Sequence, residues 1–351
     1  MSTKISRRSM LKWAVGLTAA AAAGAFAEYG SSQLLTSNEL SGNATLSLWN
    51  DTPTKQTILD YVATVTDPKN SNFVPEVNRI ATLDNDGTLW LEKPMYMQFY
   101  HLIHQIGVVA ASNPALRSQQ PFKAVYEDDQ AWFDQAAIDF SKGDLTEVKL
   151  IIDGGLEAFD GMTIDEFNAN AYDFLTNTIN PRFNVPYKQL TYKPMVELIH
   201  YLQNNGFMVY IVSGGGRDFM RSVSEEIYNI PRPNVIGSEI EYKFTVDSQG
   251  KAQVVRTSEI EQPIDNGPDK SINIARGVGR RPVLAAGNTD GDIQMLQYAK
   301  SNPGLSLGFL VHHDDADREY AYDNGAETAL EQASGSDWIV VSMKNDWKQI
   351  F

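Results

Sequence analysis

Four short apolar segments recur along the chain, and each of them stops at a cluster of small or polar residues. They are Arg79–Asp84, Phe207–Val212, Pro282–Ala286 and Leu305–Val311. A stretch that is compatible with a helix follows each segment. Because alternating buried strands and helices are typical of a parallel, doubly wound sheet, the pattern predicts an α/β fold. Ligands of such sheets bind beyond the C-terminal ends of the strands, so we expect the chemistry where these segments stop.

Helical spacing of apolar residues marks several further segments. Thr52–Thr66 opens with Thr-Pro and predicts a helix before the first strand. About 120 residues separate the first two strands, which is too many for a simple crossover. Within them, Pro94–Pro194 contains three helical patterns, so we expect an inserted helical cap domain: Gln98–Ala111, Gln130–Lys142 and Thr163–Asn177. Glu239–Arg256 predicts a hairpin that turns at residues 247–250.

The N-terminal segment differs from the rest of the chain. Met1–Lys12 carries four basic residues and no acidic one, and the apolar run Trp13–Ala27 ends in Ala-Phe-Ala. This layout is typical of a signal peptide, and Ser6–Lys12 resembles a twin-arginine signal. The apolar run is shorter than the roughly 20 residues that span a bilayer. We therefore expect passage through the twin-arginine export machinery, cleavage that leaves no stable membrane span, and a periplasmic or secreted bacterial protein. Retention of the segment as an uncleaved anchor is the alternative.

These patterns together predict four segments. They are a signal peptide (1–27), a tether with the first part of the α/β core (28–93), the helical cap (94–194) and the remainder of the core (195–351).

Composition narrows the range of partners. The 351 residues include 29 Lys and Arg against 44 Asp and Glu, which gives a formal net charge of −15. An acidic surface repels phosphate backbones, so we expect no nucleic-acid partner. The chain has no cysteine, which excludes disulfides, thiolate zinc sites and a cysteine nucleophile.

The strongest chemical signal is Asp84-Asn85-Asp86-Gly87-Thr88, directly after the first predicted strand. Two acids spaced two residues apart at the end of a buried strand can both project toward one ligand. A calcium loop is excluded, because its twelfth position would be Met95 rather than Glu and its sixth position is not Gly. The beginning of a capped helix would leave the buried pair of acids unexplained.

Three further motifs follow in order. Ser213-Gly214-Gly215 follows the second strand, Lys270 lies in a predicted helix, and Gly287–Asp292 follows the third strand. In this order the four motifs resemble those of the haloacid dehalogenase superfamily of aspartate-nucleophile phosphatases, from Arg79 to roughly Val341. Asp84–Thr88 resembles the DxDGT motif of that superfamily. The long insert between the first two motifs resembles the phosphoserine-phosphatase-like branch, which has a helical cap.

The resemblance implies a mechanism that depends on Mg2+. Asp84 would be the nucleophile and would form an aspartyl-phosphate intermediate. Mg2+ would bridge the Asp84 carboxylate and a phosphoryl oxygen, and would also bind the backbone carbonyl of Asp86. Asp86 would protonate the leaving alkoxide and then activate the attacking water. Because a halide needs no proton to leave, the acid at position 86 favours phosphoryl transfer over dehalogenation.

The remaining motif residues are assigned by the same resemblance. Phosphoryl binding falls to Thr88, Ser213, Gly214 and Lys270. The fourth motif of the superfamily usually begins with Gly-Asp, whereas here Asn288 takes the place of the metal-binding Asp. We expect Asn288 with Asp292 to complete the metal site, and Asp290 is the alternative ligand. The histidine pair His312-His313, at the end of the fourth strand, is interpreted either as a metal or pH-sensitive site or as a part of the surface.

The sequence therefore predicts an exported, Mg2+-dependent phosphomonoester hydrolase that acts on a small phosphorylated substrate. One alternative is a phosphotransferase or mutase of the same superfamily. The other is a non-catalytic protein that binds a phosphorylated ligand, for which Asn288 is the sole support.

Overall fold

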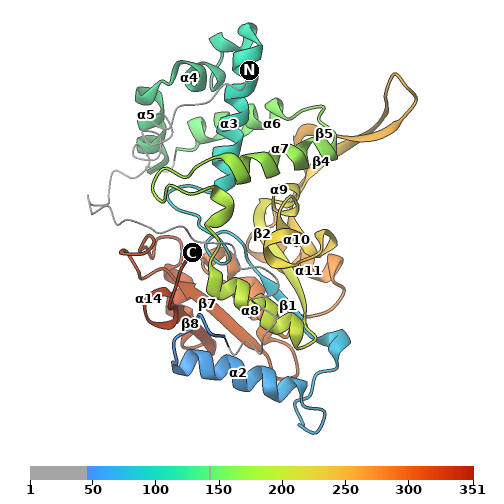
Figure 1. Ribbon diagram of the computed structural model, residues 1–351, viewed down its shortest axis with the longest axis vertical. Coiled ribbons are helices and arrows are strands. Elements are labelled where there is room, and N and C mark those ends of the chain that lie inside the picture. The colour runs from blue at the N-terminus through green and yellow to red at the C-terminus, as the bar shows by residue number, and fades with distance from the viewer. Residues whose placement is uncertain (1–45, 142–143) are drawn as a thin grey trace. The chain divides into compact units, whose positions relative to one another are not determined.

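The computed structural model describes residues 46–141 and 144–351, and these residues form two compact units (Figure 1). The α/β unit consists of residues 46–91, Gln189–Glu239 and Gln262–Phe351. The helical unit consists of Glu92–Lys188 and Ile240–Glu261. The predicted signal peptide lies outside the described residues. No helix in the described part of the chain combines the length and the hydropathy that crossing a bilayer requires.

A six-stranded sheet is the centre of the α/β unit, in the order β3-β2-β1-β6-β7-β8. Its strands are β1 (Ile80–Leu83), β2 (Met208–Gly216), β3 (Val235–Ser238), β6 (Leu284–Gly287), β7 (Leu307–His312) and β8 (Trp338–Ser342). Every neighbouring pair of strands is parallel. All four residues of β1 are buried, so both faces of the sheet are covered at its centre. The predicted doubly wound α/β fold is confirmed.

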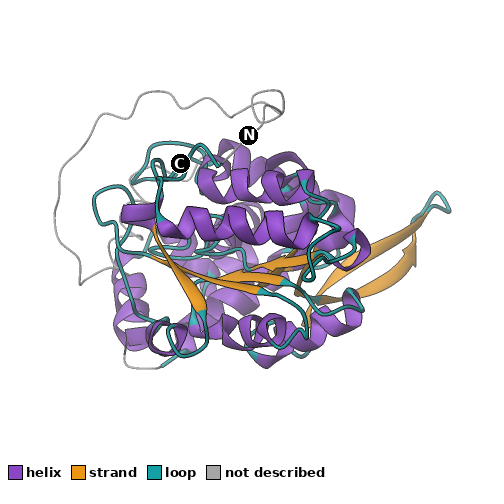
Figure 2. Ribbon diagram, turned by 90° about the horizontal axis from the view of Figure 1, so that it is seen from below, coloured by secondary structure: helices purple, strands orange, loops and turns teal. Residues whose placement is uncertain are grey.

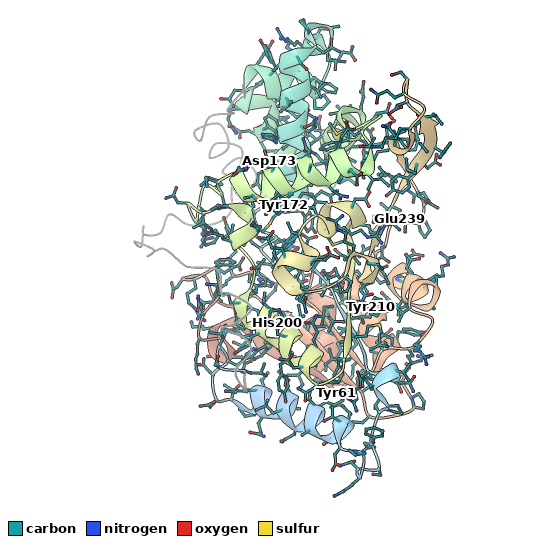
Figure 3. All side chains as sticks on the ribbon, turned by 45° about the vertical axis from the view of Figure 1, so that its right-hand side comes forward. Tyr61, Tyr172, Asp173, His200, Tyr210 and Glu239 are labelled. Carbon is teal, nitrogen blue, oxygen red and sulfur yellow. The ribbon has the colours of Figure 1, made fainter. Side chains whose placement is uncertain are left out.

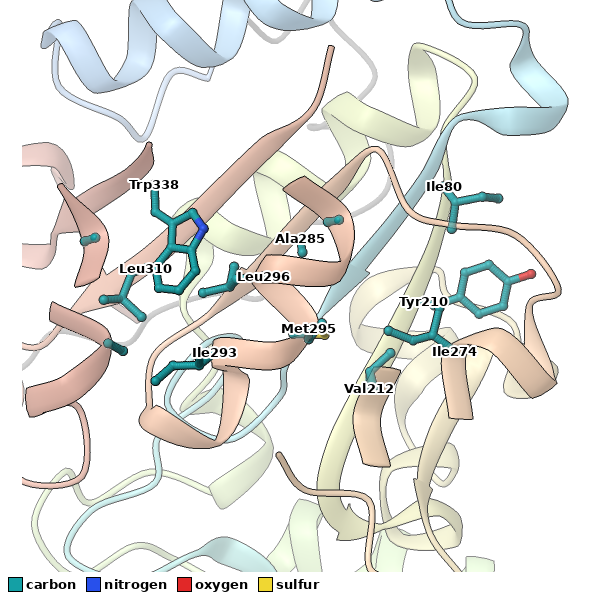
Figure 4. Packing of buried hydrophobic residues seen from close by; sticks show 13 residues of the cluster. Ile80, Tyr210, Val212, Ile274, Ala285, Ile293, Met295, Leu296, Leu310 and Trp338 are labelled. Atoms are coloured by element: carbon teal, nitrogen blue, oxygen red, sulfur yellow. The ribbon is translucent and has the colours of Figure 1, made fainter. Parts of the chain in front are cut away.

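Helices cover this sheet, and helices and strands can be told apart in Figure 2. They are α2 (Pro53–Thr66), α8 (Lys193–Asn204), α9 (Arg217–Arg221), α10 (Ser224–Tyr228), α11 (Pro268–Gly277), α12 (Ile293–Lys300), α13 (Glu327–Ala333) and α14 (Met343–Asp346). Figure 4 shows one layer of the core, where Ile274 of α11 and Leu296 of α12 pack with Ala285 and Leu310 of the sheet. Burial of this apolar surface stabilises the unit.

The predicted helix before the first strand is α2. Thr52 caps its N-terminus by accepting a hydrogen bond from the amide of Lys55, and Pro53 occupies the first turn, where a missing N–H costs nothing. Its apolar face is buried. The hydroxyl of Tyr61, labelled in Figure 3, donates to the carbonyl of Val283 at 2.6 Å. Burial raises the pKa of Tyr61, so this hydroxyl stays neutral.

The described residues of the helical unit form five α-helices and one hairpin. They are α3 (Met97–Ser112), α4 (Phe122–Glu127), α5 (Gln130–Ser141), α6 (Thr146–Ala158), α7 (Ile164–Asn177), β4 (Ile240–Val246) and β5 (Ala252–Ile260). The hairpin comes late in the chain, within residues 195–351, yet it belongs to the helical unit. The amide of Arg256 donates to the carbonyl of Met162 at 2.8 Å, and its guanidinium lies 3.7 Å from the ring centroid of Phe167.

The strand order brings the ends of three motif-bearing strands together. β1 lies between β2 and β6, and Leu83 is in register with Ile211 on one side and Ala286 on the other. Parallel strands end at the same edge of a sheet. The residues that follow β1 and β6, and the end of β2, are therefore neighbours.

Candidate active site

The first motif forms a tight turn at the end of β1. The amide of Asp84 donates to the carbonyl of Ala286 at 2.9 Å, which extends the strand ladder by one residue. The carbonyl of Asn85 then accepts hydrogen bonds from three following amides, including that of Trp90 at 3.1 Å. Gly87 has a φ of +74°, a conformation that glycine adopts without strain. The turn therefore depends on this glycine.

Three charged side chains contact one another at this turn. Lys270 Nζ lies 2.6 Å from Asp84 Oδ1 and 2.5 Å from Asp292 Oδ1. The three residues are 3%, 5% and 0% exposed, respectively. Burial, and after it the charge of Asp292, raises the pKa of Asp84, against the opposing effect of Lys270. Burial opposes the charged form of Lys270, yet the two carboxylates raise its pKa above the ordinary value. The site thus contains two carboxylates for one ammonium.

The two oxygens of Asp84 have different surroundings. Oδ1 accepts the hydrogen bond from Lys270, whereas Oδ2 makes no hydrogen bond to any residue that the structure describes. One oxygen is thus held in place and the other is available to a ligand.

Asp292 organises the fourth motif. Its Oδ2 accepts hydrogen bonds from the amide of Asn288 at 3.0 Å, and from the amide and hydroxyl of Thr289 at 3.0 and 3.2 Å. A Cβ atom on Gly287 would lie 2.4 Å from the Asp292 Cβ, so glycine alone fits there. Both carboxylate oxygens of Asp292 are engaged. Its contribution is therefore to orient the motif and Lys270.

Asn288 and Asp290 differ in where their side chains bind. Thr88 Oγ1 donates to Asn288 Oδ1 at 3.1 Å, and both side chains are buried beside the first motif. Asp290 Oδ1 instead accepts from the amide of Ala329 in α13 at 2.7 Å. Asn288 is thus hydrogen-bonded to the first motif, whereas one oxygen of Asp290 is hydrogen-bonded to the backbone of α13. The contacts also show that the Thr88 hydroxyl orients Asn288.

The second motif lies in the last part of β2. Ser213 is 1% exposed, and its Oγ accepts a hydrogen bond from the amide of Gly215 at 3.1 Å, which leaves its own proton to donate. Gly214 is exposed, and a Cβ atom on it would lie 3.7 Å from the nearest atom, the carbonyl oxygen of Asp265. The sequence places these residues after the strand, at the beginning of a helix. The structure shows that β2 continues to Gly216 and that α9 begins at Arg217.

A family model described as haloacid dehalogenase-like hydrolase matches residues 81–297, which is more than half of the chain. The chain belongs to this family. The matched region contains all four motifs. No curated protein matches the chain.

The solved structures that match this hydrolase share little sequence with it. A protein of unknown function from Bordetella pertussis Tohama I is 15% identical over 75% of this chain and 98% of its own, with a TM-score of 0.48. A functionally unknown protein from Anaerococcus prevotii DSM 20548 is 14% identical over 82% and 91%, with a TM-score of 0.49. A phosphoserine phosphohydrolase-like protein from Francisella tularensis subsp. tularensis SCHU S4 is 15% identical over 72% and 92%, with a TM-score of 0.38.

The oxygen donors of this hydrolase suit a hard divalent cation. Asp84 Oδ2 has no hydrogen-bond partner among the described residues. The Asn288 amide oxygen accepts a hydrogen bond from Thr88 and is therefore held beside the first motif. The two carboxylates exceed the single ammonium, so a cation would relieve the burial of an excess negative charge. No group of three or more acidic or histidine side chains in the described chain is arranged to hold a metal. Carboxylate and amide oxygens are donors of the type that Mg2+ prefers, and Mg2+ keeps several waters beside few protein ligands, so the oxygens of Asp84 and Asn288 fit this ion.

Three residues outside the four motifs also lie at the hydrolase site. Trp90, which follows the first motif in the sequence, donates from Nε1 to Asp86 Oδ1 at 2.6 Å. Tyr228 is buried near Asp86, since burial and then the charge of Asp86 raise the pKa of its hydroxyl. Asp265 is fully buried five residues before Lys270. The spacing of Trp90, four residues after Asp86, is the one signal in the sequence that could have revealed any of them.

Proposed function

We propose that the protein is a phosphatase that hydrolyses phosphomonoesters through an aspartyl-phosphate on Asp84. The observation that carries the proposal is the asymmetric environment of this carboxylate, with Lys270 on Oδ1 and no partner from the described chain on Oδ2. A nucleophile must be oriented and have one free oxygen. A buried ion pair retained only for stability does not require the second oxygen to stay unpaired.

The chemistry follows in two steps. Asp84 Oδ2 attacks phosphorus, the bond from phosphorus to the ester oxygen breaks, and Asp86 gives its proton to the departing alcohol oxygen. Asp86 then takes a proton from a water molecule, whose oxygen attacks phosphorus and releases phosphate and the Asp84 carboxylate. The hydrogen bond from Trp90 Nε1 supports this role, because it orients the Asp86 carboxyl group.

Binding of the phosphoryl group falls to Ser213, Gly214 and Lys270. The Ser213 hydroxyl retains a proton to donate, and the exposed backbone of Gly214 allows close approach of an oxyanion. Lys270 supplies positive charge beside the nucleophile. Phosphoryl transfer depends mainly on positioning and on neutralising charge, and these residues provide both.

Mg2+ would be held by the Asp84 carboxylate, the Asp86 backbone carbonyl and the Asn288 amide oxygen. Asp292 would act indirectly, because both of its oxygens are engaged. When bound, the ion reduces the repulsion between the carboxylate and the phosphate. We further propose export by the twin-arginine route and release of phosphate from small organic phosphoesters in the periplasm or outside the cell.

The decisive experiment compares phosphate release by the purified full chain and by Asp84→Asn, on a panel of phosphomonoesters with and without Mg2+. We expect turnover that requires Mg2+ and falls at least about 1,000-fold in the variant, since the amide is not a nucleophile. Asp290→Asn is the matched control, because its remaining oxygen can still accept from Ala329. We expect it to stay within about threefold of the wild type. Tight binding of phosphoesters without turnover, equal in the wild type and in Asp84→Asn, would instead identify a binding protein.

A further inference from the structure

A buried histidine at the end of β7 contacts the turn that follows β1. His313 directly follows β7 and is 2% exposed. Its Nε2 lies 2.8 Å from the carbonyl oxygen of Gly87, and its Nδ1 lies 3.1 Å from Glu319 Oε2. Glu319 is fully buried, and the ring of Tyr322 stacks on the imidazole with the ring centroids 4.3 Å apart. The sequence placed His313 on the ligand side but gave no partner for it.

The hydrogen-bond partners of His313 determine where one of its hydrogens lies. A carbonyl oxygen accepts hydrogen bonds and donates none, so Nε2 of His313 must carry a hydrogen. Nδ1 and the Glu319 carboxyl group then share one further proton, whichever of them holds it. In both forms the pair is neutral overall and Nε2 remains a donor to Gly87. The Gly87 carbonyl therefore requires the hydrogen on Nε2, and Glu319 holds the ring in the orientation that directs Nε2 toward Gly87.

Gly87 is a position where such support matters. Glycine has the least restricted backbone of any residue, and this one connects Asp86 to Thr88. The turn itself holds Gly87 by one bond, from its amide to the carbonyl of Trp90 at 2.8 Å. His313 holds the carbonyl side of the same residue from a different strand.

We propose that His313, oriented by Glu319, is a positioning residue that fixes the Gly87 peptide and thereby aims Asp86 at the leaving group. The inference rests on the proposed phosphatase function. Loss of this bond releases the turn, so protonation of the leaving group suffers most, while attack by Asp84 on an ester that needs no acid suffers least.

Two amide variants test whether the hydrogen bond at the position of Nε2 is the one that matters. In His313→Asn the amide reaches about as far as Nδ1, and in His313→Gln about as far as Nε2. We would measure kcat/KM with Mg2+ for ethyl phosphate, whose alkoxide needs a proton, and for p-nitrophenyl phosphate, whose phenolate does not. This quantity reports the steps up to departure of the alcohol. Asp86→Asn gives the reference for loss of the acid, and His200→Asn, in α8, is the control for an unlinked histidine.

We expect His313→Asn to lower kcat/KM for ethyl phosphate by about 10- to 100-fold and that for p-nitrophenyl phosphate by less than about threefold. His313→Gln should recover most of the loss. An equal loss on both esters, or no recovery in His313→Gln, would overturn the positioning role and leave the phosphatase proposal intact. Absence of turnover in the wild type on any ester would overturn both.

A second pair of variants covers the case in which His313→Asn does not fold. Glu319→Gln can donate its amide hydrogen to Nδ1 and so keep the imidazole oriented, whereas Glu319→Leu leaves Nδ1 without this hydrogen bond and the ring without its anchor. We expect the selective loss on ethyl phosphate in Glu319→Leu and not in Glu319→Gln. Equal ratios of the two esters in both variants would contradict the proposal.

Discussion

The site buries three charged residues together: Lys270, Asp84 and Asp292. Removing three ionisable groups from water costs several kcal/mol for each ion, and pairing them recovers this cost only in part. Here the pairing is incomplete, because one ammonium serves two carboxylates. Well-packed apolar residues of the same volume would stabilise the fold at least as well. Stability alone therefore does not account for the three residues, which supports the proposed role of this site in phosphoryl transfer.

Asp265 gives a prediction about pH at the same scale. It is fully buried, Oδ1 accepts from Asn273 Nδ2 at 2.9 Å, and Oδ2 has no hydrogen-bond partner within the described chain. Burial raises the pKa of Asp265 from 3.8 to about 6. The folded state thus holds the proton more tightly than the unfolded state, so the stability that this group contributes is complete below pH 3.8 and is lost as the pH rises through about 6.

Asp265→Asn should therefore stabilise the protein more at high pH than at low pH. The amide resembles the protonated acid and keeps the acceptor for Asn273. We expect the free energy of unfolding of the variant, relative to the wild type, to rise by about 2 kcal/mol between about pH 4.5 and about pH 8. Urea unfolding followed by circular dichroism measures it. A relative stability that does not change with pH would show that Asp265 is ionised in the folded protein across this range.

The motif residues were accessible to sequence reasoning because each follows a strand or opens a helix at a recognisable spacing. The structure brings Asp84, Lys270 and Asp292 into direct contact, as the order of motifs suggests. Tyr228 had no such signal, and the signal for His313, its place at the end of a strand, did not reveal its partners. Their place in the site depends on contacts between elements far apart in sequence, such as the 226 residues between Gly87 and His313. A linear pattern contains no information on such pairs.

At the scale of elements, the predictions succeeded where burial is continuous and failed where it is partial. The four predicted strands correspond to β1, β2, β6 and β7, and the predicted hairpin to β4 and β5. The edge strands β3 and β8 were missed. Residues of β3 alternate between buried and half-buried positions and include a glycine, so β3 shows no apolar run. β8 does contain an apolar run, Trp338–Val341, but its second and third residues are half-buried and exposed. Edge strands pair on one side only and are less completely buried, so their sequences are less distinct from those of loops.

Packing of α6 against α3 in the helical unit gives a prediction at this scale. A Cβ atom on Gly155 would lie 2.7 Å from Leu102 Cβ and 2.8 Å from its Cδ2. Gly155→Ala should therefore destabilise the unit by about 1–3 kcal/mol, although alanine favours a helix by about 1 kcal/mol over glycine. Gly335→Ala is the control, because the nearest atom to its Cβ lies 3.8 Å away. Thermal unfolding of both variants measures the difference, and equal midpoints would show that α3 and α6 can move apart at no cost.

At the scale of the whole molecule, the arrangement into two units goes beyond what the order of elements reveals. The helical patterns between the first two strands indicated an insert. The hairpin, however, is separated from that insert along the chain by β2 and β3. Its backbone bonds to residues 161 and 162 and the contact of Arg256 with Phe167 place it in the same unit as the insert. Sequence patterns delimit elements along the chain, whereas membership of a unit depends on contacts across it.

The charge distribution along the chain leads to the last prediction, which concerns export. The protein is strongly acidic, with a net charge of −15, yet its first twelve residues contain four basic and no acidic ones. If the twin-arginine machinery reads the pair at positions 7 and 8, Arg7→Lys with Arg8→Lys should abolish export although the charge is unchanged. Lys4→Gln with Lys12→Gln is the matched control, because it removes two charges, leaves the pair intact and should preserve export. Fractionation of bacterial cells measures the exported share, and N-terminal sequencing should give a chain that begins at Glu28. Equal export of both variants would show that charge alone, or another route, directs the protein.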